Sequence, residues 1–300
     1  MRGLSKLPQL QDFQLILTRI EPFIENSDGI QLDLLSGLKK ISLSGIYFRR
    51  DIVNRLAGLI AKSPQLVHLE VKLCRYGVSW ETTSTLHDLL SKVPEDHPLQ
   101  LTHLALERTG ICIDSFTLPH LRSLTSLDLR NLPSLSNYFA NLTDELFFNS
   151  GSPEWAYSTS TFDIFAILKK EGILLKHVVS DVGVFDYLCS YSGLETLDLC
   201  SMNFNNVEES NTSARTFFQS VLPQLVQSLQ VLKIQPDREG RWCFNPEDDF
   251  QSVALSQCNK LRSLSVSLNS TSFIRSINYY SRVCALHQYK DNLNDEVCPW

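Results

Sequence analysis

One short phrase of aliphatic residues recurs along the chain and constrains its fold more than any other feature. The phrase is a leucine, two residues, a leucine or isoleucine, one residue and a further aliphatic residue. Two looser copies begin at Leu10 and Leu38. Clear copies begin at Leu66, Leu101, Leu124, Leu194, Leu229 and Leu261. Within each copy, apolar and variable positions alternate as in a β-strand that buries one face.

The recurrence of this phrase predicts a repeat architecture. A single copy cannot bury its aliphatic side chains alone, whereas copies that stack can share one elongated core. We interpret the phrase as the strand phrase of a leucine-rich repeat. The expected fold is therefore an α/β leucine-rich-repeat solenoid. Its curved parallel β-sheet would form the concave side, and helices would form the convex side.

The spacing of the copies predicts about eight or nine repeats within residues 1–275. Most steps between first leucines are 28 to 35 residues long, as from Leu10 to Leu38 and from Leu66 to Leu101. The step of 70 residues from Leu124 to Leu194 is too long for one repeat.

Three further segments complete the predicted organisation. We expect a degenerate copy of the phrase at residues 175–179, within the long step. A segment rich in small polar residues near 144–161 is predicted to be a loop insertion. The repeat pattern dissolves toward the end of the chain, and residues 276–300 are predicted to form an irregular tail.

The segments between the strand phrases show helical spacing of apolar residues. The short step from Leu101 to Leu124 leaves room only for a turn or a 3₁₀ segment, around residues 117–120. Predicted helix starts lie at Thr83 or Ser84, at Ser213 and at Asn245-Pro246. The apolar faces are Ile52, Leu56, Leu59 and Ile60; Leu86, Leu89, Leu90 and Val93; Phe217, Val221, Leu222 and Leu225; and Phe250, Val253 and Ala254.

The repeats are expected to be irregular. The asparagine that usually follows the strand of such a repeat is replaced by Cys74, Thr109 and Leu132 in three consecutive copies. Cysteine and threonine can form only part of its hydrogen bonds, and leucine can form none. We therefore expect uneven curvature along the sheet.

Composition and charge restrict the partners of the chain. Its net charge of −6 argues against a general nucleic-acid binder or an anionic-membrane binder. No apolar run of about 18 residues is present, so no membrane span is expected. We predict an unknown protein partner on the concave face, no nucleic acid and no membrane.

The cysteines and the first residues indicate the compartment. The first eight residues lack the apolar core of a secretory signal. The 8 cysteines are scattered singly without a CxxC pair, and we interpret Cys74, Cys200 and Cys258 as buried reduced thiols. The protein is expected to be intracellular, either cytoplasmic or nuclear.

Side chains between the inward-facing aliphatic residues should line the concave face in rows. Two interpretations stay open: solvated positions whose charges balance across neighbouring strands, or a mixed-charge recognition surface for a folded partner. The predicted partner-binding residues are His68, Glu70, Lys72, His103, Glu107, Asp128, Arg130, Asp198 and Lys233.

Aromatic anchors, which often dominate protein interfaces, are missing from these strand positions. Trp242 is expected to lie on the rim of the solenoid. Loop aromatic residues would serve either as caps over the repeat edge or as anchors: Tyr47, Phe48, Tyr76, Trp80, Trp155 and Tyr157.

No catalytic constellation is recognisable in the sequence. Gly-rich phosphate loops, a GxSxG elbow and an HExxH motif are all absent. His68 and His103 should be neighbours on adjacent strands, but two histidines without a third ligand make a poor metal site. We expect no enzymatic activity, no metal and no cofactor.

The assembled pattern resembles the leucine-rich part of fungal F-box proteins over about residues 10 to 275. The resemblance rests on Tyr191-Ser192-Gly193-Leu194 through Leu197-Asp198-Leu199, Phe217-Phe218-x-x-Val221-Leu222-Pro223, Ser228-Leu229-x-x-Leu232-x-Ile234, Gly240-x-Trp242-Cys243-Phe244 and Cys258-x-x-Leu261-x-x-Leu264-Ser265-Val266-Ser267. In that family, the repeats capture a target protein, and a separate F-box docks a cullin ubiquitin ligase.

The resemblance implies a substrate-recognition module of such a ligase. No F-box is recognisable in the chain, so a ubiquitin-ligase adaptor is an expected partner only if an F-box lies outside it. We interpret the chain as a truncated or mis-spliced family member, or as a gene model with wrong ends. A structural scaffold or remnant without a ligase role is the second hypothesis. An enzyme or extracellular receptor fragment is the third.

Overall fold

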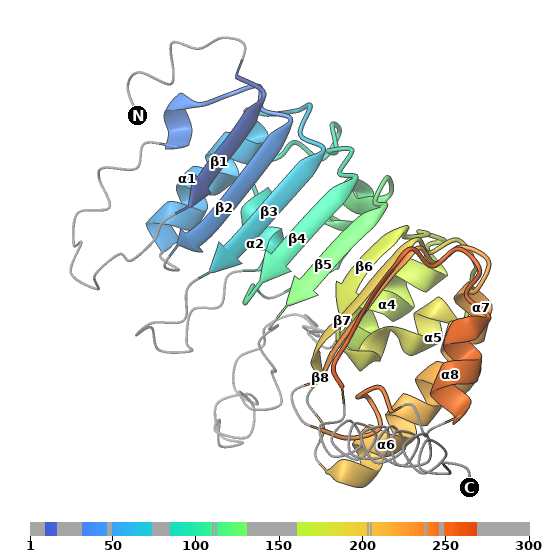
Figure 1. The fold of residues 1–300 in the computed structure, drawn as a ribbon. Coiled ribbons are helices and arrows are strands. Elements are labelled where there is room, and N and C mark those ends of the chain that lie inside the picture. The colour runs from blue at the N-terminus through green and yellow to red at the C-terminus, as the bar shows by residue number, and fades with distance from the viewer. Residues whose placement is uncertain are drawn as a thin grey trace, which may run out of the picture.

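The computed structural model contains one parallel β-sheet whose strands follow one another in chain order (Figure 1). The structure describes residues 10–16, 32–46, 50–73, 85–109, 111, 113–130, 161–202, 204, 206–236, 239–245 and 249–268. Within them the strands are β1 (Asp12–Ile16), β2 (Lys40–Ile46), β3 (His68–Leu73), β4 (His103–Glu107), β5 (Ser126–Arg130), β6 (His177–Ser180), β7 (Thr196–Met202), β8 (Val231–Pro236) and β9 (Ser263–Val266).

Each predicted copy of the aliphatic phrase coincides with a strand, and the degenerate copy at 175–179 overlaps β6. All eight strand pairings are parallel. The predicted α/β architecture with a parallel sheet is therefore confirmed. The loop aromatic residues, Cys74, Leu132 and nearly all of the 144–161 insertion lie outside the described residues, as does the tail at 276–300.

Helices connect the strands and lie together on one side of the sheet (Figure 1). The α-helices are α1 (Arg50–Ala61), α2 (Leu86–Leu90), α4 (Thr161–Lys170), α5 (Phe185–Leu188), α6 (Val207–Thr216), α7 (Leu222–Leu225) and α8 (Asp249–Ser256). The 3₁₀ segments are η3 (Leu32–Leu34), η4 (Leu118–Leu121) and η5 (Val182–Val184), and η6 (Phe217–Val221) is a π-helix. The short connection predicted around residues 117–120 is η4.

The core is a continuous spine of aliphatic side chains between the sheet and the helices. Central residues of successive strands are in register from Phe13 to Leu264. All of them are buried except Leu264, which is 44% exposed on the last described strand. The row is Phe13, Ile41, Leu69, Leu104, Leu127, Val178, Leu197, Leu232 and Leu264.

Local capping shifts the start of α2 by one or two residues from its predicted position. The hydroxyl of Thr85 accepts a hydrogen bond from Asp88 N–H, and the Asp88 carboxylate accepts one from Thr85 N–H. This reciprocal capping box begins the helix after Thr85 and not at Thr83 or Ser84. The helix ends at Leu90, and Val93 is buried beyond it.

The predicted helix start at Ser213 is wrong. Helix α6 begins after Asn206, whose side chain accepts a hydrogen bond from Glu209 N–H. Apolar periodicity missed these turns because they carry almost only polar residues. The following π-helix places both Phe217 and Phe218 in the core, although they are adjacent in sequence.

The predicted inner face of α8 is also partly wrong, because Val253 is 55% exposed. Gln251 takes the buried place and is fully enclosed. Its side-chain amide donates hydrogen bonds to Arg241 and Cys243 carbonyls, and its oxygen accepts one from Asn245 N–H. A buried glutamine fits this position because the 239–245 loop presents backbone groups that need hydrogen-bond partners.

The predicted position of Trp242 on the rim of the solenoid is wrong. The side chain is buried and only 1% exposed. Its ring lies 5.6 to 6.3 Å from four phenylalanine rings. The Gln251 bonds hold the loop that inserts it, so the segment 239–245 contributes to the core. The four rings are those of Phe185, Phe204, Phe217 and Phe218.

The prediction of buried reduced thiols is confirmed for Cys200 and Cys258, which are buried and outside any disulfide. Cys243 is also free and buried, whereas Cys189 is free and exposed. Burial raises the pKa of the Cys243 and Cys258 thiols. Within the described ranges, none of the helices has the length and apolarity needed to cross a bilayer.

Truncating the spine should destabilise the chain. Leu197 is fully buried, so Leu197→Ala is expected to lower the free energy of unfolding by about 2–5 kcal/mol. The matched control is Leu174→Ala, because Leu174 is 57% exposed and its change should cost about 0.5 kcal/mol or less. Urea unfolding followed by circular dichroism measures both values. Equal losses in the two variants would contradict the role of Leu197 in the shared core.

Two buried serines should respond oppositely to alanine substitution. Ser180 faces the core in register with Leu199, and its hydroxyl has no hydrogen-bond partner. Ser63 is equally buried, but its hydroxyl accepts a 3.1 Å hydrogen bond from Leu38 N–H. Ser180→Ala should be neutral or stabilising, whereas Ser63→Ala should cost about 1–3 kcal/mol. Thermal unfolding distinguishes the two, and a Ser180→Ala loss as large as that of Ser63→Ala would contradict this assignment.

Candidate functional site

The strand residues that point away from the helices line one face of the sheet, which we call the open face. Strand register arranges them in rows, and all nine predicted partner-binding residues lie there. One row contains Asp12, Lys40, His68, His103, Ser126, His177, Thr196, Val231 and Ser263. The next contains Gln14, Ser42, Glu70, Ala105, Asp128, Val179, Asp198, Lys233 and Ser265. A third contains Ile16, Ser44, Lys72, Glu107 and Arg130.

Glu70 is satisfied by groups on its own strand and on β2. It forms an ion pair with Lys72 and accepts a 2.7 Å hydrogen bond from the Ser42 hydroxyl. Partial burial acts to raise the pKa of Glu70, but these two partners outweigh it and lower the pKa. Glu70 and Lys72 are therefore held in place before any partner arrives.

His68 and His103 stack face to face on adjacent strands. Their ring centroids are 3.9 Å apart and the planes differ by 1°. His103 Nδ1 is hydrogen-bonded to the Ser126 hydroxyl at 2.8 Å. Burial, and then the neighbouring His68, lowers the pKa of His103 to about 4, and burial also lowers the pKa of His68. Both rings are thus uncharged at neutral pH, which permits such close stacking.

Asp128, Arg130 and Asp198 form a second charged group, on β5 and β7. Arg130 Nε donates a 3.0 Å hydrogen bond to Asp128, and its terminal nitrogen lies 3.6 Å from an oxygen of Asp198. Burial raises the pKa of Asp128, although Arg130 opposes this effect. Asp198 was expected to be displayed to solvent, but only 5% of it is exposed. Its other carboxylate oxygen is buried without a hydrogen-bond partner.

Charges on the open face are compensated mainly within a strand or next to its end. Glu70 pairs with Lys72 on β3, Asp128 with Arg130 on β5, and Glu107 lies 3.7 Å from Arg108. Balance of charges across neighbouring strands, as one interpretation of the sequence expected, is therefore not the main arrangement among these pairs. Lys233 is in register with Asp198, yet among the described residues it forms no ion pair.

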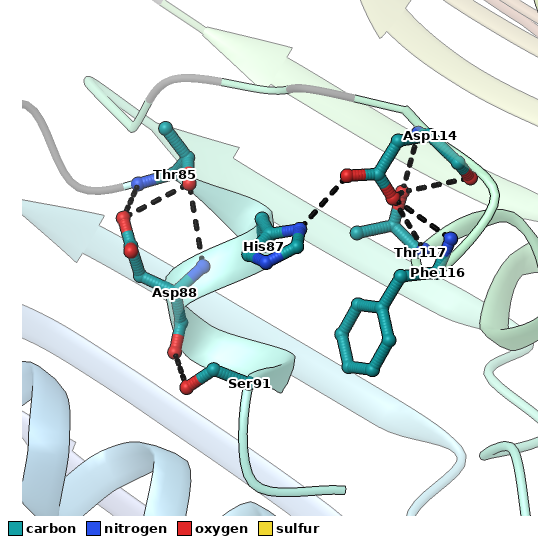
Figure 2. A network of polar contacts seen from close by, with 7 residues as sticks. All are labelled: Thr85, His87, Asp88, Ser91, Asp114, Phe116 and Thr117. Atoms are coloured by element: carbon teal, nitrogen blue, oxygen red, sulfur yellow. Dashed lines mark hydrogen bonds and ion pairs between the residues drawn. The ribbon is translucent and has the colours of Figure 1, made fainter. Parts of the chain in front are cut away.

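Sequence reasoning missed a polar network that joins two consecutive repeats (Figure 2). His87 points from α2 toward Asp114, with its Nδ1 2.8 Å from a carboxylate oxygen. The other oxygen accepts hydrogen bonds from Phe116 N–H and from the backbone and hydroxyl of Thr117. An Asp-x-x-Thr segment before a Leu-Pro helix start is a capping signal that could have been noticed.

This His87–Asp114 network stabilises structure. Partial burial acts to raise the pKa of Asp114, but the Thr117 and His87 hydrogen bonds outweigh it and lower the pKa below 3.8. Asp114 is therefore ionised at neutral pH, and both of its oxygens are engaged. A carboxylate held in this way positions the loop before η4 against α2.

The described side chains do not include three or more His, Cys, Asp or Glu residues arranged to hold a metal ion. Comparison with family models, curated proteins and solved structures found no match for the chain.

The His103 environment predicts a pH dependence of stability. Because its folded pKa of about 4 lies below the ordinary value of 6.5, the unfolded chain takes up the proton first. Stability should fall as the pH drops from about 6.5 toward about 4. His103→Gln should weaken this dependence, whereas a change at His97, whose side chain is 79% exposed, should not. Urea unfolding at pH 7 and pH 5 measures the loss of unfolding free energy between the two pH values. An equal loss in wild type and His103→Gln would contradict the prediction.

Proposed function

We propose that the chain is an intracellular leucine-rich-repeat solenoid that binds another protein on its open face. One observation carries the proposal. Nine parallel strands present rows of polar and charged side chains, while the described helices lie on the opposite side of the sheet (Figure 1). Stacked repeats that leave a long, uncovered sheet face commonly use it for binding.

The assignment to leucine-rich repeats is supported by the match between phrase and strand. Every strand lies at a copy of the phrase, and the central apolar side chains other than Leu264 share one core. In the two 28-residue steps at the start of the chain, the described residues include a helical segment between consecutive strands, η3 in the first step and α1 in the second. These features, with the resemblance to F-box proteins, favour a substrate-recognition array.

The proposed mechanism is non-covalent capture. Ion pairs such as Glu70–Lys72 and Asp128–Arg130 hold charged side chains in defined positions on the free protein. Pre-ordered side chains lose less conformational entropy when a partner binds. A pattern of alternating charge also selects a partner of complementary charge more than it adds raw affinity. The open face would therefore confer specificity.

A ubiquitin-ligase adaptor would be a second partner if an F-box is connected to these repeats. The alternative is a structural scaffold or a remnant without a ligase role. Internal pairing of the charges on the open face is the observation that favours this alternative, because paired groups need no partner. Sequencing the transcript upstream of Met1 separates the two: an in-frame F-box supports the ligase role, and a stop codon supports the alternative.

A charge swap on β3 tests the proposed binding face. Glu70→Lys combined with Lys72→Glu keeps the ion pair and the net charge but reverses the local polarity. The control swap, Glu208→Lys with Arg215→Glu, lies on exposed positions of α6. Each tagged protein is used for affinity enrichment from source-cell extract, followed by quantitative mass spectrometry. Thermal unfolding verifies that both variants fold.

We expect at least one protein that wild type enriches to fall about tenfold with the β3 swap and to remain with the α6 swap. Such a difference would identify a partner that contacts the open face. Binding on this face would be contradicted if all partners are still enriched by the β3 swap variant, or if both swaps lower their enrichment equally. If wild type enriches no protein, the result would favour the alternative of a structural scaffold.

A further inference from the structure

Asp198 differs from the part-buried carboxylates Glu70 and Asp128 of the open face in its incomplete hydrogen bonding. Glu70 has Ser42 and Lys72, and Asp128 has Arg130. Asp198 has only a 3.6 Å contact with the Arg130 guanidinium, which is too long for a hydrogen bond. Its second oxygen is buried and has no partner. A buried carboxylate without hydrogen bonds is strongly unfavourable, so this one requires an explanation.

The position of this oxygen follows from the sheet. Arg130 on β5 and Asp198 on β7 are separated by β6, so their strands lie about 10 Å apart. Val179 on β6 lies between Asp128 and Asp198 in the same row, and Arg130 lies one row further along the strands, so the Arg130 and Asp198 side chains meet across β6. Val179 therefore forms an apolar floor, with Asp128 on one side and Asp198 on the other. We call this arrangement the Val179 subsite.

The carboxylates of the Val179 subsite outnumber the cations that contact them. The subsite contains two carboxylates and one guanidinium, and Lys233 beside it makes no ion pair among the described residues. Burial also raises the pKa of Asp128, which is the response of an acid with too little compensation. Arg130 is 39% exposed and contacts Asp198 only loosely, so it can move to admit another group.

We propose that the Val179 subsite receives an arginine or lysine side chain of the partner protein. The apolar part of that side chain would lie on Val179, and its charged end would donate hydrogen bonds to Asp198 and Asp128. This inference rests on the proposed function, because it names the chemistry by which the open face recognises its partner. A metal ion is disfavoured as the occupant, because the Arg130 guanidinium already lies between the two carboxylates.

The test uses the full chain and a displayed library of random 12-residue peptides. Peptides are selected on wild type and retained only if the Glu70→Lys/Lys72→Glu swap weakens them, which restricts the set to the open face. We expect arginine or lysine at one shared position in the retained peptides. A synthetic peptide of that sequence is then compared with one in which citrulline replaces the arginine (or norleucine replaces the lysine), which removes the charge but keeps the shape.

Binding is measured by isothermal titration calorimetry on wild type, Asp198→Asn and the control Glu208→Gln. Glu208→Gln removes a carboxylate of equal charge from an exposed position on α6, outside the open face. We expect Asp198→Asn to weaken binding of the charged peptide about tenfold or more, and the neutral peptide to bind wild type about tenfold or more weakly. Glu208→Gln should have little effect. Combining the variant with the neutral peptide should add no further loss, since both remove the same interaction.

Each failure has a separate meaning. Open-face peptides without a shared basic residue, or with unchanged affinity for Asp198→Asn, would overturn the Val179 subsite and leave the binding face intact. If no retained peptide exists, the proposed function fails as well. The neutral-peptide comparison on wild type decides the question if Asp198→Asn does not fold. Finally, the free energy of unfolding is compared for Lys233→Met, Asp198→Asn and the double variant. If the two losses are not additive, Lys233 is the missing partner of Asp198, which would also overturn the proposal.

Discussion

The shared burial of aliphatic side chains from consecutive strands is the interaction on which the rest of the structure depends. Leu104, Leu127, Val178 and Leu197 are in register and buried, although none of their strands could bury them alone. Because the apolar sides meet the helices, the intervening side chains must point to the open face. The same constraint that builds the core therefore displays the candidate binding residues.

Regular stacking also creates an electrostatic problem on the open face. Equivalent residues of neighbouring strands lie about 4.8 Å apart, so charged rows must be compensated locally. Pairs two residues apart on one strand, such as Glu70 with Lys72 and Asp128 with Arg130, provide most of this compensation. Asp198 is the buried exception, and for that reason it is the most informative residue on the face.

Several features could not be predicted because they depend on partners that are distant in sequence. Trp242 looked like a rim residue, but four phenylalanine rings from other segments enclose it. Helix α6 was placed too late because its first turns face away from the core and carry polar residues. Val253 was expected inside α8, yet Gln251 is buried because nearby backbone groups need its amide.

The positions of the strands, their order and the residues that share the open face all followed from the amino-acid pattern. The reason is that strand alternation and repeat spacing are local and periodic properties. The prediction of adjacent His68 and His103 succeeded because it needed only register between two copies. The burial of Asp198, the pairing of the other charged groups, the stacking geometry of the histidines and the His87–Asp114 network became visible only in the folded protein. These outcomes depend on contacts between residues of different strands or repeats, which no local pattern encodes.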